Sequence, residues 1–124
     1  MISADRRYSE NHQWAQSGSD GIMTVGITHH AQALLGDVVF VEPPVLGRKL
    51  RMGEQCGVVE SVKSASDIYA PVSGEVTGIN FDLDTAPEKI NQDAWIFKIK
   101  PADEAEWATL LDAEAYKKLI EAQF

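Results

Sequence analysis

The sequence predicts a mainly β domain of short strands that ends in a helical segment. Runs of β-branched residues separated by glycine and proline turns extend to residue 100, and apolar residues recur at spacings of three and four after Pro101. With 124 residues, 44% hydrophobic and 24% charged, the chain has the size and composition of one globular domain. We therefore expect residues 1–124 to form a single domain, with the helical segment at about 102–122.

The first elements are a predicted hairpin and a short helix. Residues 22–27 follow a turn cluster at 17–21 and are typical of the return strand of a hairpin. Thr28 can cap a short helix that extends to Leu35, and Gly36 is suited to end it.

Strands and glycine turns follow. Residues 38–41 are β-branched or aromatic, which predicts a buried strand that halts at Pro43-Pro44. Further strands are predicted within 57–62 and 74–79. Residues 80–93 are expected to form a loop with one helical turn near Pro87.

The last strand and the C-terminal segment differ in period. Residues 95–100 alternate well enough for a strand. Beyond it, Trp107, Leu110 and Leu119 belong to an apolar pattern of helical period, which predicts one amphipathic helix or two short ones.

Two Pro-Val-x-Gly turns lie 27 residues apart, at 44–47 and 71–74. Each follows an aspartate and a β-branched residue, Asp37-Val38 and Asp67-Ile68. Chance turn chemistry and a duplicated hairpin unit both produce this pattern. Duplication would place Lys63 where the two copies join.

The charge balance narrows the possible partners. Nineteen acidic residues oppose eleven basic ones, a net charge of −8. This argues against a nucleic-acid partner and against anionic membranes, and no apolar run approaches the roughly 20 residues that span a bilayer. The single cysteine, Cys56, suits a reducing compartment. The N-terminus shows no secretory signal or transit peptide, so we expect the cytoplasm of a bacterium.

Lys63 stands out because strand formers precede it and turn formers follow it. Val58, Val59 and Val62 favour a strand, whereas residues 64–67 are small and turn-forming. A lysine at such a bend is exposed and stiffly held, as an acylating enzyme requires. A Schiff-base or general-base lysine needs a desolvated pocket instead. The pattern favours a lysine that is modified over one that catalyses.

Residues 57–76, which contain Glu60-Ser61-Val62-Lys63, resemble the lipoylation segment of glycine cleavage H-proteins. The resemblance continues through residues 26–42 upstream and through 95–100 and 110–116 downstream, and so covers nearly the whole chain. Biotin carriers usually flank their lysine with methionines, and lipoyl domains of 2-oxoacid dehydrogenases usually read Asp-Lys-Ala. The neighbours of Lys63 in this chain are Val62 and Ser64, which fit neither of these two classes of carrier.

The resemblance implies a barrel-sandwich hybrid of the lipoyl/biotinyl type and lipoic acid held by an amide at Lys63. It implies a non-catalytic carrier that takes the aminomethyl group of glycine from glycine decarboxylase (P protein) to the aminomethyltransferase (T protein). Dihydrolipoyl dehydrogenase (L protein) reoxidises the arm, and a lipoyl- or octanoyl-transferring enzyme attaches it. The expected protein is a monomer with no bound metal.

Further residues match family positions one by one. Glu60 and Gly47 match positions linked to recognition by the lipoylating enzyme, although a solvated carboxylate and a turn glycine need no such role. Asp67 matches an acid lining the cleft where the arm docks, or it only closes the turn. A carboxylate suits that cleft because an aminomethyl group is cationic.

The chain departs from the family pattern at two places. The family usually has His-Glu-Trp near its N-terminus, with a glutamate that faces the docked arm, whereas this chain has Asn11-His12-Gln13-Trp14. Asn11 and Gln13 are therefore expected at the cleft without a negative charge, which predicts weaker protection of the loaded arm. The chain is also several residues shorter between Asp93 and Trp95.

Two other functions remain open. An H-like protein that relays lipoyl groups to other acceptors would share these motifs. The departure from the family pattern at Gln13 leaves that alternative open. An unmodified interaction domain would not need the intact Glu60–Lys63 motif. Adjacent His29 and His30 would point about 100° apart on a helix, which is poor geometry for one metal ion. Cys56 is expected to be a small strand residue.

Overall fold

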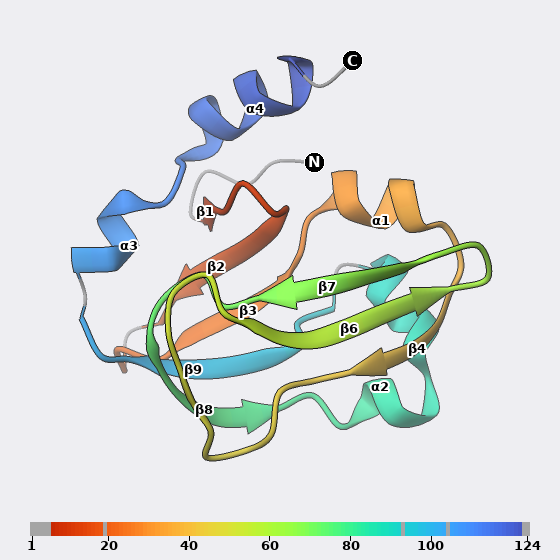
Figure 1. Ribbon diagram of the computed structural model, residues 1–124, viewed down its shortest axis with the longest axis horizontal. Coiled ribbons are helices and arrows are strands. Elements are labelled where there is room, and N and C mark those ends of the chain that lie inside the picture. Colours follow the sequence, from red (N-terminus) through yellow and green to blue (C-terminus); the bar gives the residue numbers. More distant parts are fainter. Residues whose placement is uncertain (1–5, 19, 93, 104, 123–124) are drawn as a thin grey trace.

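Two antiparallel sheets form the body of the computed structural model, which describes residues 6–18, 20–92, 94–103 and 105–122 (Figure 1). The strands are β1 (Arg7–Tyr8), β2 (Gln13–Ser17), β3 (Met23–Ile27), β4 (Val38–Glu42), β5 (Lys49–Leu50), β6 (Gln55–Ser61), β7 (Ala65–Tyr69), β8 (Gly74–Ile79) and β9 (Phe97–Pro101). One sheet has the order β1-β2-β3-β9-β8-β5 and the other β4-β6-β7. The predicted mainly β architecture is confirmed.

Both sheets contribute to a single apolar core. Val25, Val76 and Phe97 come from the larger sheet, and Val59 and Ile68 come from the smaller one; each is at most 1% exposed. Because each sheet turns one face toward the other, the opposite face of the smaller sheet stays open to solvent. The smaller sheet thus has one face in the core and one face exposed.

The predicted first hairpin and first helix are confirmed. β2 pairs with β3, and Trp14 stands opposite Gly26. The helix α1 (His29–Leu35) begins after Thr28, whose Oγ1 accepts a hydrogen bond from the Ala31 N–H at 3.3 Å. It ends at Gly36, whose φ of 76° favours glycine because L side chains rarely adopt it.

The prediction of a fully buried strand at 38–41 is wrong in its burial. Val38 and Val41 are buried, but Val39 and Phe40 are 51% and 47% exposed. The register of β4 on β6 shifts between Val38 and Phe40, so a bulge leaves two consecutive side chains pointing outward. The β-branched run predicted the strand but not which faces its residues occupy.

The segment from residue 80 to the last strand is more helical than predicted. Instead of a loop with one helical turn, it holds the helix α2 (Asp82–Thr85) and the 3₁₀ helix η1 (Pro87–Gln92). The last strand begins at Phe97 and not at Trp95. The Trp95 carbonyl accepts a hydrogen bond from Asn80 Nδ2 at 2.8 Å and so serves the end of β8 instead. In the shortened loop, Asp93 lies outside the described residues.

The two Pro-Val-x-Gly turns occupy equivalent places in the fold. One carries the chain from β4 to β5 and the other from β7 to β8, each time from the smaller sheet into the larger one. β4 and β7 flank β6, and β5 pairs with β8. This correspondence favours the duplicated-unit interpretation of the repeat.

The C-terminal segment forms two helices, α3 (Ala105–Thr109) and α4 (Ala113–Ala122), as one of the two predicted possibilities. Between them Leu111 exchanges two backbone hydrogen bonds with Tyr8, at 2.7 and 2.8 Å. Tyr116 of α4 packs with Tyr8 and Trp14 in a second, smaller apolar cluster. Figure 1 shows α4 on the side of the molecule that carries the N-terminal strands and α1. Among the described helices, none has the length and apolar character needed to cross a bilayer.

Candidate functional site

Lys63 lies at the exposed bend between β6 and β7, as predicted, but the turn is shorter than the predicted 64–67 because β7 already begins at Ala65. The bend is the free end of the hairpin that projects to one side in Figure 1. Ser61 fixes its shape, because its Oγ accepts hydrogen bonds from the backbone N–H groups of Lys63 at 3.4 Å and Ser64 at 3.1 Å. The Ser61 N–H also donates to the Ser64 carbonyl at 2.7 Å. The backbone that carries the amine is therefore held firmly while the amine faces solvent.

The end of α1 lies directly beside this bend. The Asp37 carbonyl accepts a hydrogen bond from the Val62 N–H at 3.2 Å. A Cβ placed on Gly36 would lie 3.5 Å from Lys63 Cε and 3.8 Å from its Nζ. The lysine side chain thus runs past the helix end, where a residue without a side chain leaves it room.

Glu60 and Asp67 belong to the same hairpin. Glu60 lies on β6 opposite Phe40 and Ala65, and Asp67 lies on β7 opposite Val58. Both carboxylates are exposed. The Tyr69 hydroxyl lies 3.5 Å from the Asp67 carboxylate, which orients one acid along the outside of β7.

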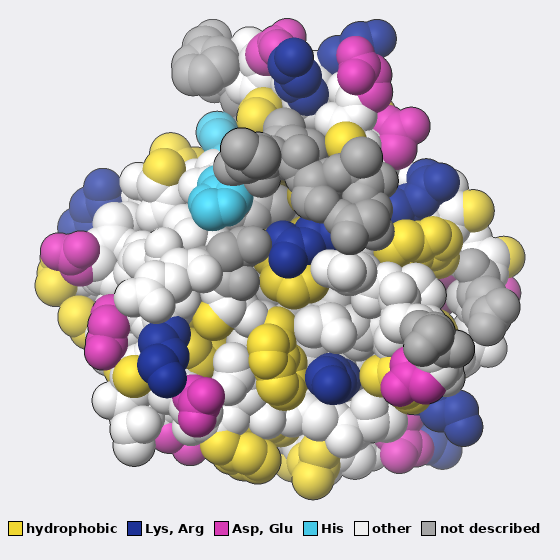
Figure 2. All heavy atoms as spheres, turned by 180° about the vertical axis from the view of Figure 1, so that it is seen from behind, with side chains coloured by type: hydrophobic (Ala, Val, Ile, Leu, Met, Phe, Trp, Pro, Cys, Tyr) yellow, Lys and Arg dark blue, Asp and Glu magenta, His cyan; other side chains and the backbone are white. Residues whose placement is uncertain are grey.

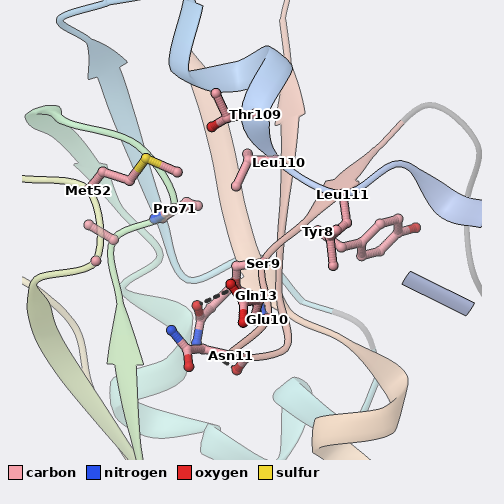
Figure 3. Close-up of a pocket in the computed structure, with 12 residues that line it drawn as sticks. Tyr8, Ser9, Glu10, Asn11, Gln13, Met52, Pro71, Thr109, Leu110 and Leu111 are labelled. Carbon is pink, nitrogen blue, oxygen red and sulfur yellow. Dashed lines mark hydrogen bonds between the residues drawn. The ribbon is translucent and has the colours of Figure 1, made fainter. Parts of the chain in front are cut away.

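Asn11 and Gln13 line a pocket of about 280 Å³ on another part of the surface (Figure 3). In Figure 3 the residues of the 9–13 turn gather on one side of it and face Met52 and Pro71, while Thr109 and Leu110 lie above. The pocket is lined by Tyr8, Ser9, Glu10, Asn11, Gln13, Met52, Gly53, Ala70, Pro71, Thr109, Leu110 and Leu111. The structure thus brings Asn11 and Gln13 together, whereas Lys63, Glu60 and Asp67 are not lining residues.

The amide of Gln13 is used inside the 9–13 turn. The side chain is 1% exposed. Its Nε2 donates to the Asn11 carbonyl at 2.9 Å, and its Oε1 accepts from Ser9 Oγ at 2.7 Å. Both ends of the amide therefore have partners, and these two hydrogen bonds hold the 9–13 turn in shape.

Gly47 lies in the turn between β4 and β5. Its φ of 85° favours glycine, although a Cβ there would meet nothing within 4 Å. Its N–H donates to the Val76 carbonyl at 2.8 Å. In Figure 1 the segment from β4 to β5 lies far from the β6–β7 bend, so Gly47 has a structural reason to be glycine that does not involve Lys63.

The family of the chain follows from comparison with known proteins. The family model described as "Glycine cleavage H-protein" matches residues 6–123. The chain belongs to the glycine cleavage H-protein family. The H protein of Thiobacillus denitrificans is 56% identical over 98% of this chain and 97% of its own length. That of Nitrosospira multiformis is 54% identical over the same shares of the two chains.

A solved structure supports the same assignment. The crystal structure of a glycine cleavage system H protein from Mycobacterium marinum superposes with a TM-score of 0.87 at 36% identity, over 97% of this chain and 99% of that chain. The fold is accordingly the barrel-sandwich hybrid that the resemblance implied. Membership of the H-protein family makes the chain a lipoyl carrier in glycine cleavage and not an enzyme.

Cys56 and two histidines are further side chains that could carry chemistry. Cys56 is a strand residue of β6, as expected. It is also buried, and burial raises the pKa of its thiol to about 12. His12 and His30 have ring centroids 4.7 Å apart, and Tyr116 Oη lies 2.8 Å from His12 Nδ1. Across the described part of the chain, no three His, Cys, Asp or Glu side chains cluster as they would to hold a metal ion.

Sequence reasoning missed most of the pocket in this H-protein. Met52, Pro71 and Leu110 come from segments far apart in the chain, and no local pattern relates them to residue 11. Glu10 also lines the pocket, and its position next to Asn11 could have identified it. Figure 2 adds that acidic and basic side chains are interspersed on the face opposite that of Figure 1, so the net charge is not gathered there.

Proposed function

We propose that Lys63 carries lipoic acid through an amide bond. The observation that supports this is the exposed amine on a bend whose backbone is fixed by Ser61. A modifying enzyme can bind such a bend without unfolding it, and little chain entropy is lost when it docks. Pairing with β4 and β7 makes β6 a central strand, so the arm is anchored to a rigid sheet.

In this proposal the arm carries one aminomethyl group through a sequence of enzymes. Glycine decarboxylase loads it, the aminomethyltransferase unloads it, and dihydrolipoyl dehydrogenase reoxidises the dithiol. The covalent tether gives each enzyme a high effective concentration of the intermediate, so no free intermediate has to diffuse. The protein acts as a monomer in the cytoplasm of a bacterium, which accords with the bacterial sources of its relatives.

We infer that Glu60 is recognised by the lipoyl- or octanoyl-transferring enzyme. Its exposed carboxylate lies on β6 three residues before Lys63, so an enzyme bound at the bend meets it directly. Gly47 is the second proposed recognition position. Its distance from the bend would require an enzyme footprint that extends along the smaller sheet toward the β4–β5 turn.

Asn11, Gln13 and Asp67 are the proposed docking residues of the arm. β7 begins beside the bend, and the chain that follows it, Ala70-Pro71, lines the pocket. Five steps of about 3.3 Å lead from Ala65 to Ala70, roughly 17 Å. A lipoyl-lysine arm of about eleven bonds, each near 1.5 Å, has a similar contour length, about 16 Å. Asp67 lies along this route on the outside of β7.

Intact-mass measurement of protein from its own host tests the attachment. A lipoyl-sized increment is expected on the native chain and is lost in Lys63→Arg. Residues 54–93 hold eight acidic residues and two lysines, Lys63 and Lys89. Lys89→Arg is therefore the matched control and should leave the increment in place. An unmodified native chain, or an increment that survives Lys63→Arg, would overturn the proposal.

Glycine exchange reconstituted with the decarboxylase then tests the carrier step at this lysine. The lipoylated chain should support exchange of the glycine carboxyl with bicarbonate, and the Lys63→Arg chain should not. Lipoylated protein that supports no exchange would contradict the proposed role of the arm.

A further inference from the structure

Glu10 is the charged residue among those that line the pocket. The other lining side chains are hydroxyl, amide, phenol or apolar groups, and the backbone of Gly53 completes the wall. A cationic guest in this pocket therefore has one carboxylate to pair with. Asn11 and Gln13 can offer it only neutral oxygens.

Gln13 is poorly placed to take that part, because its amide is buried and held by partners inside the turn. Its Oε1 already accepts from Ser9 Oγ at 2.7 Å, and its Nε2 is committed to the Asn11 carbonyl at 2.9 Å. Turning the amide toward a guest would break both bonds in a side chain that is 1% exposed. Buried polar groups left without partners are costly, so the amide stays where it is.

Backbone hydrogen bonds of the same turn hold the chain at Glu10 beside the pocket. The His12 N–H donates to the Ser9 carbonyl at 3.1 Å, and the Gln13 N–H donates to Ser9 Oγ at 3.2 Å, which closes a turn with Glu10 and Asn11 at its outer positions. His12 has φ of 66°, a left-handed conformation that this turn requires. Glu10 is exposed and is not used in closing the turn.

We propose that Glu10 is the carboxylate that pairs with the cationic aminomethyl group when the loaded arm rests in the pocket. The proposal rests on the function proposed above, because the cargo must be carried on Lys63 to reach Glu10. It assigns to residue 10 of this chain the charge that Gln13 lacks. The expectation of weaker protection, drawn from Gln13 alone, is thereby replaced by protection from a neighbouring position.

Pairing with Glu10 slows loss of the aminomethyl group because it keeps the nitrogen of that group protonated. The loaded group is S–CH2–NH3+, and it leaves only after its nitrogen loses a proton. The nitrogen lone pair then forms CH2=NH2+ as the C–S bond breaks, and the sulfur keeps the bonding electrons and becomes the thiol when it takes up a proton. Water adds to the iminium ion, and the products are thiol, formaldehyde and ammonium. An adjacent carboxylate favours the protonated amine and raises its pKa, so a smaller fraction can react.

Two charged side chains of neighbouring segments are already engaged. The Arg7 guanidinium donates to the Leu110 carbonyl at 3.1 Å, and the Glu106 carboxylate accepts from Ser73 N at 2.8 Å and Ser73 Oγ at 3.1 Å. His12 contacts Tyr116 at the back of the turn. Tyr8 is the other titratable lining residue. Glu10 is the one of these groups that combines a negative charge with a place in the pocket wall.

The test measures release of formaldehyde from methylamine-loaded protein as a function of pH. Loading on Lys63 is first verified by mass for each variant, so failure of the proposed function is seen as absent loading and not as an altered rate. Glu10→Gln should release its cargo about two- to fivefold faster below the midpoint of the profile, as expected for loss of one exposed ion pair. Its midpoint should move down by about 0.3 to 0.7 pH units.

Two further conditions separate pairing from a general loosening of the pocket. The difference between native protein and Glu10→Gln should vanish well above the midpoint, where the amine is neutral, and should shrink in about 1 M salt, where screening is strong. Glu10→Asp should retain most of the protection. Glu42→Gln, which removes the same charge from β4 at the far edge of the smaller sheet, should match the native rate. Equal rates for loaded native and Glu10→Gln proteins, or a difference that persists in salt, would overturn the proposal.

Discussion

The Tyr116 hydroxyl lies 2.8 Å from His12 Nδ1, which ties the last helix to the turn that borders the pocket. The same hydroxyl lies 2.7 Å from Thr28 Oγ1 at the start of α1. One buried phenol therefore connects α4, α1 and the 9–13 turn. The ring of Tyr116 also stacks on Tyr8, with centroids 4.7 Å apart.

Tyr116→Phe is expected to destabilise the protein by about 1–3 kcal/mol, because it leaves His12 Nδ1 and Thr28 Oγ1 without this partner while the ring still packs. Chemical denaturation of the two proteins measures the difference. Tyr69→Phe is the control, since its hydroxyl makes one exposed contact of 3.5 Å, and it should change stability by less than about 0.5 kcal/mol. Equal losses in both variants would show that the buried connection contributes nothing of its own.

Gly26→Ala is expected to be strongly destabilising. An added Cβ would lie 2.6 Å from the ring of Trp14, which is 3% exposed and cannot move aside. Overpacking of this kind costs about 1–3 kcal/mol or more. Gly78→Ala offers a matched comparison in β8, because its Cβ would approach no atom closer than 3.4 Å. Thermal unfolding should rank Gly26→Ala clearly below Gly78→Ala, and a reversed order would contradict the assigned packing.

Cys56 should be inert toward thiol reagents in the folded protein. Burial raises the pKa of its thiol to about 12, so little of the reactive thiolate forms at neutral pH. A chromogenic disulfide reagent at pH 8 should label native protein only as fast as it opens, and should label one thiol at once in denaturant. Rapid labelling of the native chain would show that the thiol is accessible.

The same thiol and Tyr116 predict alkaline destabilisation. Burial raises the pKa of the Tyr116 phenol above its ordinary 10.0, as it raises that of Cys56 from 9.0 to about 12. An acid whose pKa is raised by folding keeps its full contribution below the pKa of the unfolded chain and loses it as the pH rises toward the folded value. Unfolding free energy should fall from about pH 9 upward. Cys56→Ala should show a shallower fall, and an unchanged slope would count against the thiol.

Glu60→Gln should lower the rate of lipoylation without changing stability. The carboxylate is exposed, so removal of its charge should leave the unfolding free energy within about 0.5 kcal/mol. Incorporation of lipoate by the transferring enzyme is compared with that of Glu42→Gln, an exposed acid on the neighbouring strand β4. Equal rates in the two variants would leave Glu60 as a solvated surface acid.

Local chemistry explains what the sequence could predict. Thr28 and Gly36 carry cap chemistry that depends on a few neighbouring residues, and the structure shows both caps. The bend at Lys63 follows from a valine-rich strand and a run of small polar residues. These signals do not need the rest of the fold to be interpreted.

Tertiary packing explains what escaped prediction. The exposure of Val39 and Phe40 depends on a bulge against β6 that their own side chains do not signal. The pocket joins the 9–13 turn to Met52 and Leu110, which the two sheets bring together across the chain. The burial of Gln13 likewise results from partners at Ser9 and Asn11 that only the folded turn supplies.

The pairing of the two Pro-Val-x-Gly units has a consequence for synthesis of the chain. β5 obtains its partner only when β8 has been made, and β6 has both neighbours only once β7 is present. The three strands of the smaller sheet are all made before β8. Their inner face, however, packs against a larger sheet that lacks β8 and β9 until the chain is nearly complete. The bend that carries Lys63 therefore reaches its final surroundings late in synthesis.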